Sequence, residues 1–327
     1  MAEAVVTRGS LPGSALGFHA GVPGASRPYA EPVAVAPFGV ATVFTYARFP
    51  LVPTAAIVLT TGLYLYGVKQ LRTRGDAWSW GRVGAFLGGE LVLVVALCSG
   101  VEAYDTTLFG VHMAQHMLLA MVVPVFLALG APVTLALRTL PTGGRRALLS
   151  LLHSRFARVI TFPAVPWLLF VFSPFALYFT SWYPATLEHP WLHQLLHVHF
   201  VLAGCLFFWP LIGVDPVPGK VSHPFRILML FATMPFHAFL GVAIMTVDSD
   251  GRSGLLAAGH YLPLIGRADT VFQQQVGGGL IWASGDLVGL LFIGVAVVQW
   301  MQASEREAAR EDRRLDRLEA ALEHEAG

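Results

Sequence analysis

The sequence of residues 112–137 is HMAQHMLLAMVVPVFLALGAPVTLAL, a stretch that contains no Asp, Glu, Lys or Arg. A helix needs about 20 mostly apolar residues to cross a bilayer, so this stretch predicts a membrane span. Other segments share that character, and together the predicted spans are 51–69, 83–101, 112–137, 158–180, 192–212, 225–246 and 277–301. We therefore expect an all-α, polytopic membrane protein, folded as a seven-transmembrane-helix bundle.

The composition agrees with a membrane protein. Of the 327 residues, 55% are hydrophobic and 13% are charged, whereas a soluble domain carries roughly 25% charged residues. The net charge of +1 gives no reason to expect nucleic acid as a partner. Cys98 and Cys205 lie in apolar segments without a C-x-x-C motif, so neither a disulfide nor a thiolate metal site is expected. No nucleophile–base motif or phosphate-binding loop occurs, and we do not expect an enzyme.

The basic residues predict how the chain is oriented. Most of the 21 Lys and Arg residues lie between the first two spans, after the third and fifth spans, or in the C-terminal tail, and such residues collect on the cytoplasmic side. We expect residues 1–50 to be a disordered or irregular extracytoplasmic tail and 51–301 to be the membrane domain. Residues 302–327, whose charges alternate in sign, should form a charged cytoplasmic helical tail. Residues 247–276 should form the longest external loop, a mobile cap.

Two histidine pairs lie near the outer ends of two predicted spans. His112 and His116 are four residues apart, and so are His193 and His197. Residues at that spacing share one face of a helix, so two pairs at similar depth can supply three or four nitrogen ligands. A single intramembrane histidine is more often hydrogen-bonded to a neighbour than a ligand, but two pairs on the same side favour a metal site.

Two further residues are candidates for the same site. His237 lies about halfway along its span, and Asp286 lies about two turns in from the outer end of the last one. An ionised carboxylate inside a bilayer needs a partner, and a metal or a metal-ligating histidine would serve. The predicted metal site therefore comprises His112, His116, His193, His197, His237 and Asp286.

The residue types favour copper as the metal. Imidazole suits copper, zinc and iron. Methionine is a soft ligand that favours Cu(I), and Met113, Met117, Met121 and Met245 all fall in the outer half of the predicted bundle. We expect copper first, with zinc and haem as alternatives.

Three segments resemble a known family. They are the run HMAQHMLL at 112–119 with LGAPVTL at 129–135, the pair His193 and His197, and QQVGGGLIW at 274–282 followed by Gly285-Asp286. Over residues 50–301 the chain resembles the CtaG-type cytochrome c oxidase assembly proteins associated with caa3-type oxidases. Two positions depart from the family pattern: Gln273, where an acid is usual, and Ile281, where methionine is frequent.

This resemblance implies a multi-pass protein of the bacterial plasma membrane that assists maturation of a haem–copper oxidase, at the copper-loading step. Its partners would be an oxidase subunit or other oxidase assembly factors. The metal would be held and then passed to an oxidase subunit in the plane of the bilayer.

Two other functions are open on the residues alone. A haem-binding membrane oxidoreductase would use His116 and His197 as axial ligands. A metal or proton transporter would need a polar route through the inner half of the bundle, where Glu90 is the strong candidate.

Overall fold

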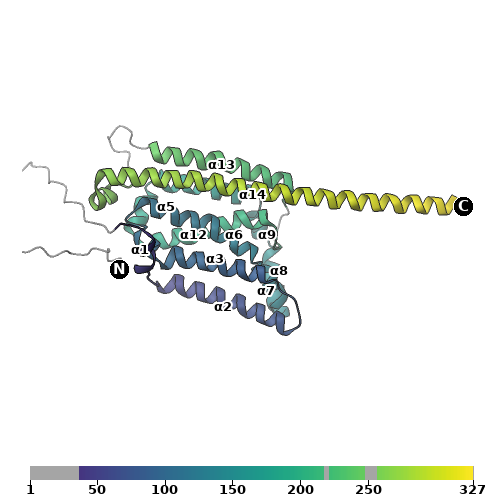
Figure 1. Ribbon diagram of the computed structural model, residues 1–327. Helices are drawn as coiled ribbons and strands as arrows, with labels where there is room; N and C mark the ends of the chain where they lie inside the picture. Colours follow the sequence, from purple (N-terminus) through teal and green to yellow (C-terminus); the bar gives the residue numbers. More distant parts are fainter. Residues whose placement is uncertain (1–36, 217–220, 247–255, 327) are drawn as a thin grey trace, which may run out of the picture.

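The computed structural model describes residues 37–216, 221–246 and 256–326, and every regular element within them is a helix (Figure 1). The elements up to residue 139 are α1 (Val40–Thr45), α2 (Leu51–Thr73), α3 (Trp80–Cys98), α4 (Gly100–Tyr104), α5 (Phe109–Met117), the π-helix η1 (Leu118–Val122), α6 (Val123–Leu129) and α7 (Pro132–Thr139). The others are α8 (Thr142–Leu152), α9 (Arg155–Ile160), α10 (Ala164–Tyr178), α11 (Trp182–Glu188), α12 (Pro190–Ile212), α13 (His223–Thr246) and α14 (Ala258–Ala326).

The predicted membrane bundle is confirmed. Six helical stretches of the described residues are long and apolar enough to cross a bilayer, and α10 with α11 makes a seventh if this bent pair counts as one span. Most of the predicted tail of residues 1–50 falls outside the described residues, and its last part contains α1. The side of the membrane on which each terminus lies stays a prediction.

The third span is not one regular helix. It runs from Phe109 to Thr139 as α5, η1, α6 and α7. The π-helix η1 begins two residues after His116, and such π segments are frequent at functional sites. Ala131 has left-handed backbone angles (φ 53°) and separates α6 from α7, which begins at Pro132.

The fourth span differs more from its prediction. Instead of a continuous helix over 158–180, α9 ends at Ile160, α10 begins at Ala164, and α11 is bent from α10 by 73°. Pro163 lies between α9 and α10, where its missing N–H and fixed φ favour a helix start rather than a helix interior. The bend after α10 brings α11 back over the end of the bundle that holds the histidine pairs.

The helices pack through glycines at several crossings. Gly204 of α12 lies against the backbone of Ala120 in η1, so an added Cβ would collide with it. Gly241 and Gly278 bring α13 and α14 together, since a Cβ at Gly278 would lie 2.6 Å from the Gly241 carbonyl oxygen. These two helices lie side by side along one edge of the bundle, and α2 lies at the opposite edge (Figure 1).

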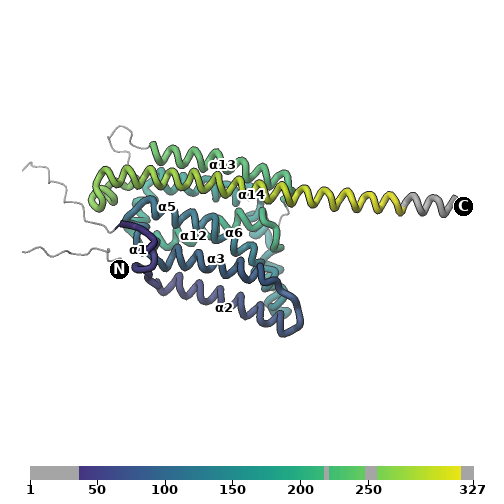
Figure 2. The backbone as a smooth tube through the Cα atoms, viewed as in Figure 1, coloured from purple at the N-terminus to yellow at the C-terminus, as the bar shows by residue number. Residues whose placement is uncertain are grey.

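Helix α14 is longer than the sequence predicts at its N-terminal end. The expected loop of 247–276 is helical from Ala258, with a kink at Gly266 (φ 75°), while 247–255 lie outside the described residues. Gln273 and Gln274 anchor this extra helix: Gln273 Oε1 accepts from the Gly110 amide, and Gln274 Nε2 donates to the Ile244 carbonyl. At its other end α14 runs on beyond the bundle as a single helix (Figure 2).

Candidate metal centre

Four histidines meet at one end of the bundle. His112 and His116 lie on α5, and His193 and His197 lie on α12, with at most 4% of any of them exposed. The ring centroids of His112 and His116 are 3.9 Å apart, and those of His193 and His197 are 4.7 Å apart. The two pairs face each other, with 5.5 Å between the centroids of His112 and His193.

Two acids complete the cluster. The carboxylate of Asp105, in the turn between α4 and α5, lies 2.8 Å from His193 Nε2 and 3.7 Å from His197 Nε2. Glu102 of α4 lies 3.8 Å from His197 Nδ1 and accepts hydrogen bonds from the side-chain amides of Gln115 (2.7 Å) and Gln194 (2.8 Å). Two carboxyl groups therefore adjoin the α12 pair, and the glutamines hold Glu102 in place.

Aromatic side chains surround the α5 pair. Tyr178 Oη is 2.9 Å from His116 Nδ1, which directs Nε2 of that ring toward the other histidines. The ring of Tyr183 lies 5.0 Å from that of His112, and its hydroxyl bonds Tyr261. Phe200 of α12 lies 4.4 Å from the His116 ring. Aromatic rings thus pack around the buried α5 imidazoles.

Several ring nitrogens of the cluster have no hydrogen-bond partner among the described residues. They are both nitrogens of His112, Nε2 of His116, Nδ1 of His193 and both nitrogens of His197. Buried nitrogen atoms are normally hydrogen-bonded, so a group of nitrogens without hydrogen-bond partners needs an explanation. One ligand atom from each of His112, His116 and His193 lies within 4.8 Å of the others, and the same is true of Asp105, His193 and His197.

The structure does not bring His237 and Asp286 to this cluster. Neither belongs to the two groups of converging ligand atoms. His237 packs against Gly285 and the ring of Phe170, with Nδ1 3.3 Å from the Thr233 carbonyl oxygen. Asp286 accepts from Trp282 Nε1 at 2.9 Å. His237 lies nine residues before the end of α13, about 13 Å along the helix axis, which is deeper than the four histidines.

Two of the four methionines that favour Cu(I) have packing roles. Met113 lies against Gly277, and Met245 lies against Gly278, where their side chains fill the space left by the missing Cβ atoms of α14. Methionine therefore adds little to the choice of metal. His260 lies in α14 with Nε2 2.7 Å from the Thr106 carbonyl oxygen, so it supports the turn that carries Asp105.

Asp105 is the residue that the sequence patterns did not single out. It lies between the predicted spans 83–101 and 112–137, just before the first histidine pair. An acid at that boundary is the available signal, but its contact with His193 joins residues 88 positions apart.

Comparisons with known proteins identify relatives of the chain. The model of the family described as "Cytochrome c oxidase caa3 assembly factor" matches residues 62–303. Uncharacterized proteins of Mycobacterium bovis and Mycobacterium tuberculosis are each 41% identical over 285 residues, covering 85% of this chain and 42% of the relative. One of Mycobacterium leprae is 39% identical, covering 84% and 42%. The chain thus spans less than half the length of these relatives, and no solved structure significantly matches it.

Proposed function

Because the chain belongs to the family of cytochrome c oxidase caa3 assembly factors, we propose that it holds a copper ion for the maturation of a haem–copper oxidase in the bacterial plasma membrane. The proposed ligands are drawn from His112, His116, His193, His197 and Asp105. The partner would be an oxidase subunit or another assembly factor, and the role is non-catalytic.

One observation supports this proposal above the others: the buried imidazoles of two helices converge with nitrogens that lack hydrogen-bond partners. Imidazole nitrogens bind a metal such as zinc at about 2.0–2.1 Å, which separates two ligands of one ion by about 3–4 Å. Ligand atoms within 4.8 Å of one another need only small side-chain rotations to reach that spacing. A bound cation would also satisfy nitrogens that are otherwise orphaned.

The arrangement of the two groups suits transfer rather than permanent storage. Both groups of converging atoms include His193, one with His112 and His116 and the other with His197 and Asp105. An ion would therefore have two overlapping sets of ligands. Exchange between sets leaves a coordination position free, which a receiving protein needs in order to take the ion.

Copper is proposed rather than zinc because the family serves an oxidase that contains copper, while imidazole and carboxylate ligands suit both ions. The metal content of the purified chain distinguishes them. We expect copper to co-purify, and its amount to fall when both imidazoles of the α5 pair are removed.

The test compares metal contents by mass spectrometry. His112→Ala with His116→Ala should lower the bound copper well below the wild-type content, because it removes two of the three ligands of one group and leaves only Asp105, His193 and His197 to hold the ion. His153→Ala with His223→Ala is the matched control, since these two histidines lie outside both groups. Wild-type copper content in the α5 double variant would overturn the proposal, as would stoichiometric zinc in place of copper.

A visible spectrum tests the haem alternative. The rings of His116 and His197 have centroids 5.9 Å apart, but those of His112 and His193 lie within 6.4 Å of His116. These rings occupy space that a porphyrin between His116 and His197 would require. A Soret band in the purified protein would contradict copper holding, and metal uptake into proteoliposomes would favour a transporter.

A further inference from the structure

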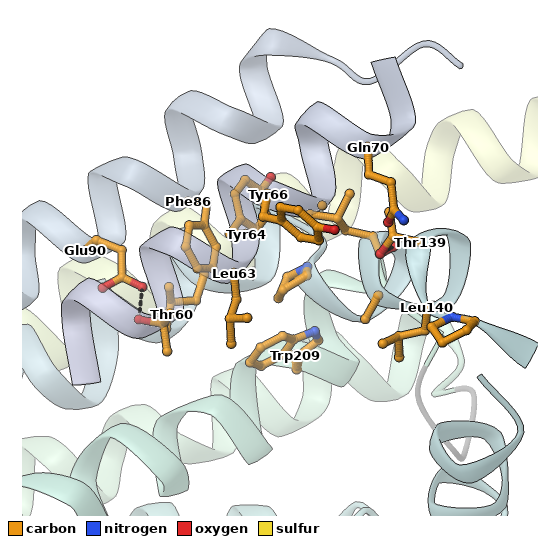
Figure 3. A pocket seen from close by; sticks show the side chains of 16 residues that line it. Thr60, Leu63, Tyr64, Tyr66, Gln70, Phe86, Glu90, Thr139, Leu140 and Trp209 are labelled. Atoms are coloured by element: carbon orange, nitrogen blue, oxygen red, sulfur yellow. Dashed lines mark hydrogen bonds between the residues drawn. The ribbon is translucent and has the colours of Figure 1, made fainter. Parts of the chain in front are cut away.

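A second feature of the bundle is a cavity of about 590 Å³ that none of the cluster histidines lines. It lies between α2, α3 and α7, with Trp209 of α12 across from them (Figure 3). Its volume is in the range of cavities that hold small molecules. Leu63 and Tyr66 at its edge are 62% and 65% exposed, so it opens on the surface that a bilayer would cover.

Glu90 lies at one end of this cavity and is short of hydrogen-bond donors. The side chain is 5% exposed, and Oε2 has no partner among the described residues. Oε1 is 2.8 Å from Thr60 Oγ1, but the same hydroxyl lies 2.9 Å from the Ala56 carbonyl oxygen and 3.1 Å from that of Ile57. One hydroxyl proton cannot serve three acceptors, so a donor from outside would be well placed at this carboxyl group.

Aromatic side chains are among the residues that line the cavity. The rings of Tyr64 and Phe86 stack at 3.8 Å between centroids, and Trp209 lies across the cavity from them (Figure 3). The polar atoms of these side chains are engaged elsewhere: Tyr64 Oη donates to the Gly130 carbonyl, and Trp209 Nε1 donates to Asp215. A ligand would therefore lie next to aromatic side chains, of which Tyr64 and Phe86 are largely buried, with a carboxyl group at one end.

We propose that this cavity binds a neutral, ring-bearing membrane amphiphile of the quinol class, whose hydroxyl donates a hydrogen bond to Glu90. The ring would lie among the aromatic side chains, and the apolar tail would leave past Leu63 and Tyr66 into the bilayer. A phospholipid headgroup fits less well, because no Lys or Arg lines the cavity and a phosphate would face an acid. This proposal does not depend on metal holding.

The experiment measures binding of a decyl-substituted benzoquinol, kept reduced, to the full chain in lipid nanodiscs. The comparison ligand is the dimethyl ether of the same quinol, which keeps the ring and tail but cannot donate. Wild-type protein should bind the quinol about tenfold more tightly, the effect of one hydrogen bond to a buried group. Glu90→Leu should abolish this preference, while Glu188→Gln, at an exposed acid of α11, should keep it.

A second variant tests the cavity without changing the acid. Ala136 lines the cavity, and Ala136→Phe would place a ring inside it, so both ligands should bind more weakly. Thermal unfolding confirms that each variant is folded. Equal binding of quinol and ether to the wild type, or binding unaffected by Glu90→Leu and Ala136→Phe, would overturn the proposal. Tighter, Glu90-dependent binding of decylamine would also overturn it in favour of a cationic amphiphile.

Discussion

The two histidine pairs of the candidate metal centre lie in different surroundings. The imidazoles of the α5 pair are enclosed by aromatic rings, and those of the α12 pair adjoin Asp105 and Glu102. Groups that orient a metal ligand and raise its basicity act through such contacts, and losing one typically lowers metal affinity 10–100-fold. In the proposed site, Asp105 would either orient His193 or bind the ion itself.

Replacing Asp105 therefore has a defined consequence. Asp105→Asn keeps a carbonyl oxygen for the hydrogen bond with His193 but removes the negative charge next to the α12 pair. We expect copper affinity to fall about 10–100-fold, measured by competition with a chromogenic chelator. Asp76→Asn is the control, because Asp76 is half-exposed and pairs with Arg138 outside the cluster. Unchanged affinity in Asp105→Asn would exclude a role for this carboxylate in metal holding.

At the scale of helices, the distance between the two histidine pairs depends on how closely α12 approaches η1. Gly204 lies against the Ala120 carbonyl group and Pro124, and both partners belong to the third span. Backbone cannot move aside as a flexible side chain can. The glycine therefore sets the separation between the elements that carry the two histidine pairs.

A single methyl group at this crossing should disturb both stability and the site. Gly204→Ala should lower the free energy of unfolding by about 1–3 kcal/mol, the usual effect of overpacking, and should reduce copper binding because the pairs move apart. Gly84→Ala is the control: Gly84 also lies within a spanning helix, but nothing lies within 4 Å of the added Cβ. Equal melting temperatures for Gly204→Ala and Gly84→Ala would contradict this account of the crossing.

At the scale of the whole molecule, the bundle and the end of α14 differ in packing: the bundle has a buried core, and the end of α14 is exposed. Side chains of residues 304–317 are almost all exposed, and the ion pair of Arg314 with Glu311 lies within the helix itself. Surface pairs of this kind contribute little to stability. The projecting part of α14 therefore adds charge and length to the protein but little to the packing of its membrane domain.

Removing that extension should leave the core properties intact. A chain ending at Ala303 should unfold at the same temperature as the full chain in detergent and should bind the same amount of copper, because no ligand candidate is lost and the described side chains after Ala303 include no core residue. Both are measured on the purified protein. A lower unfolding temperature would show that the extension supports the bundle.

The histidine pairs were predictable because the spacing of four residues within a helix is a local relation. Each membrane span is likewise recognised from its own run of apolar residues, so the positions of the spans along the chain could be predicted from the sequence. The composition of a segment gave a wrong prediction where contacts with other helices stabilise the segment. The Gly- and Asp-containing stretch after Ala258 is helical because Gln273 and Gln274 bond it to α5 and α13.

Contacts between side chains of different helices could not be predicted from the residue spacing within any one helix. Asp105 reaches His193 only because the turn after α4 lies against α12, and His237 misses the cluster because its depth along α13 differs. Depth and rotation of one helix against another are decided by close packing, at contacts such as Gly204 with Ala120. Residue spacing along a chain describes one helix at a time, whereas a metal site or a cavity is formed by several.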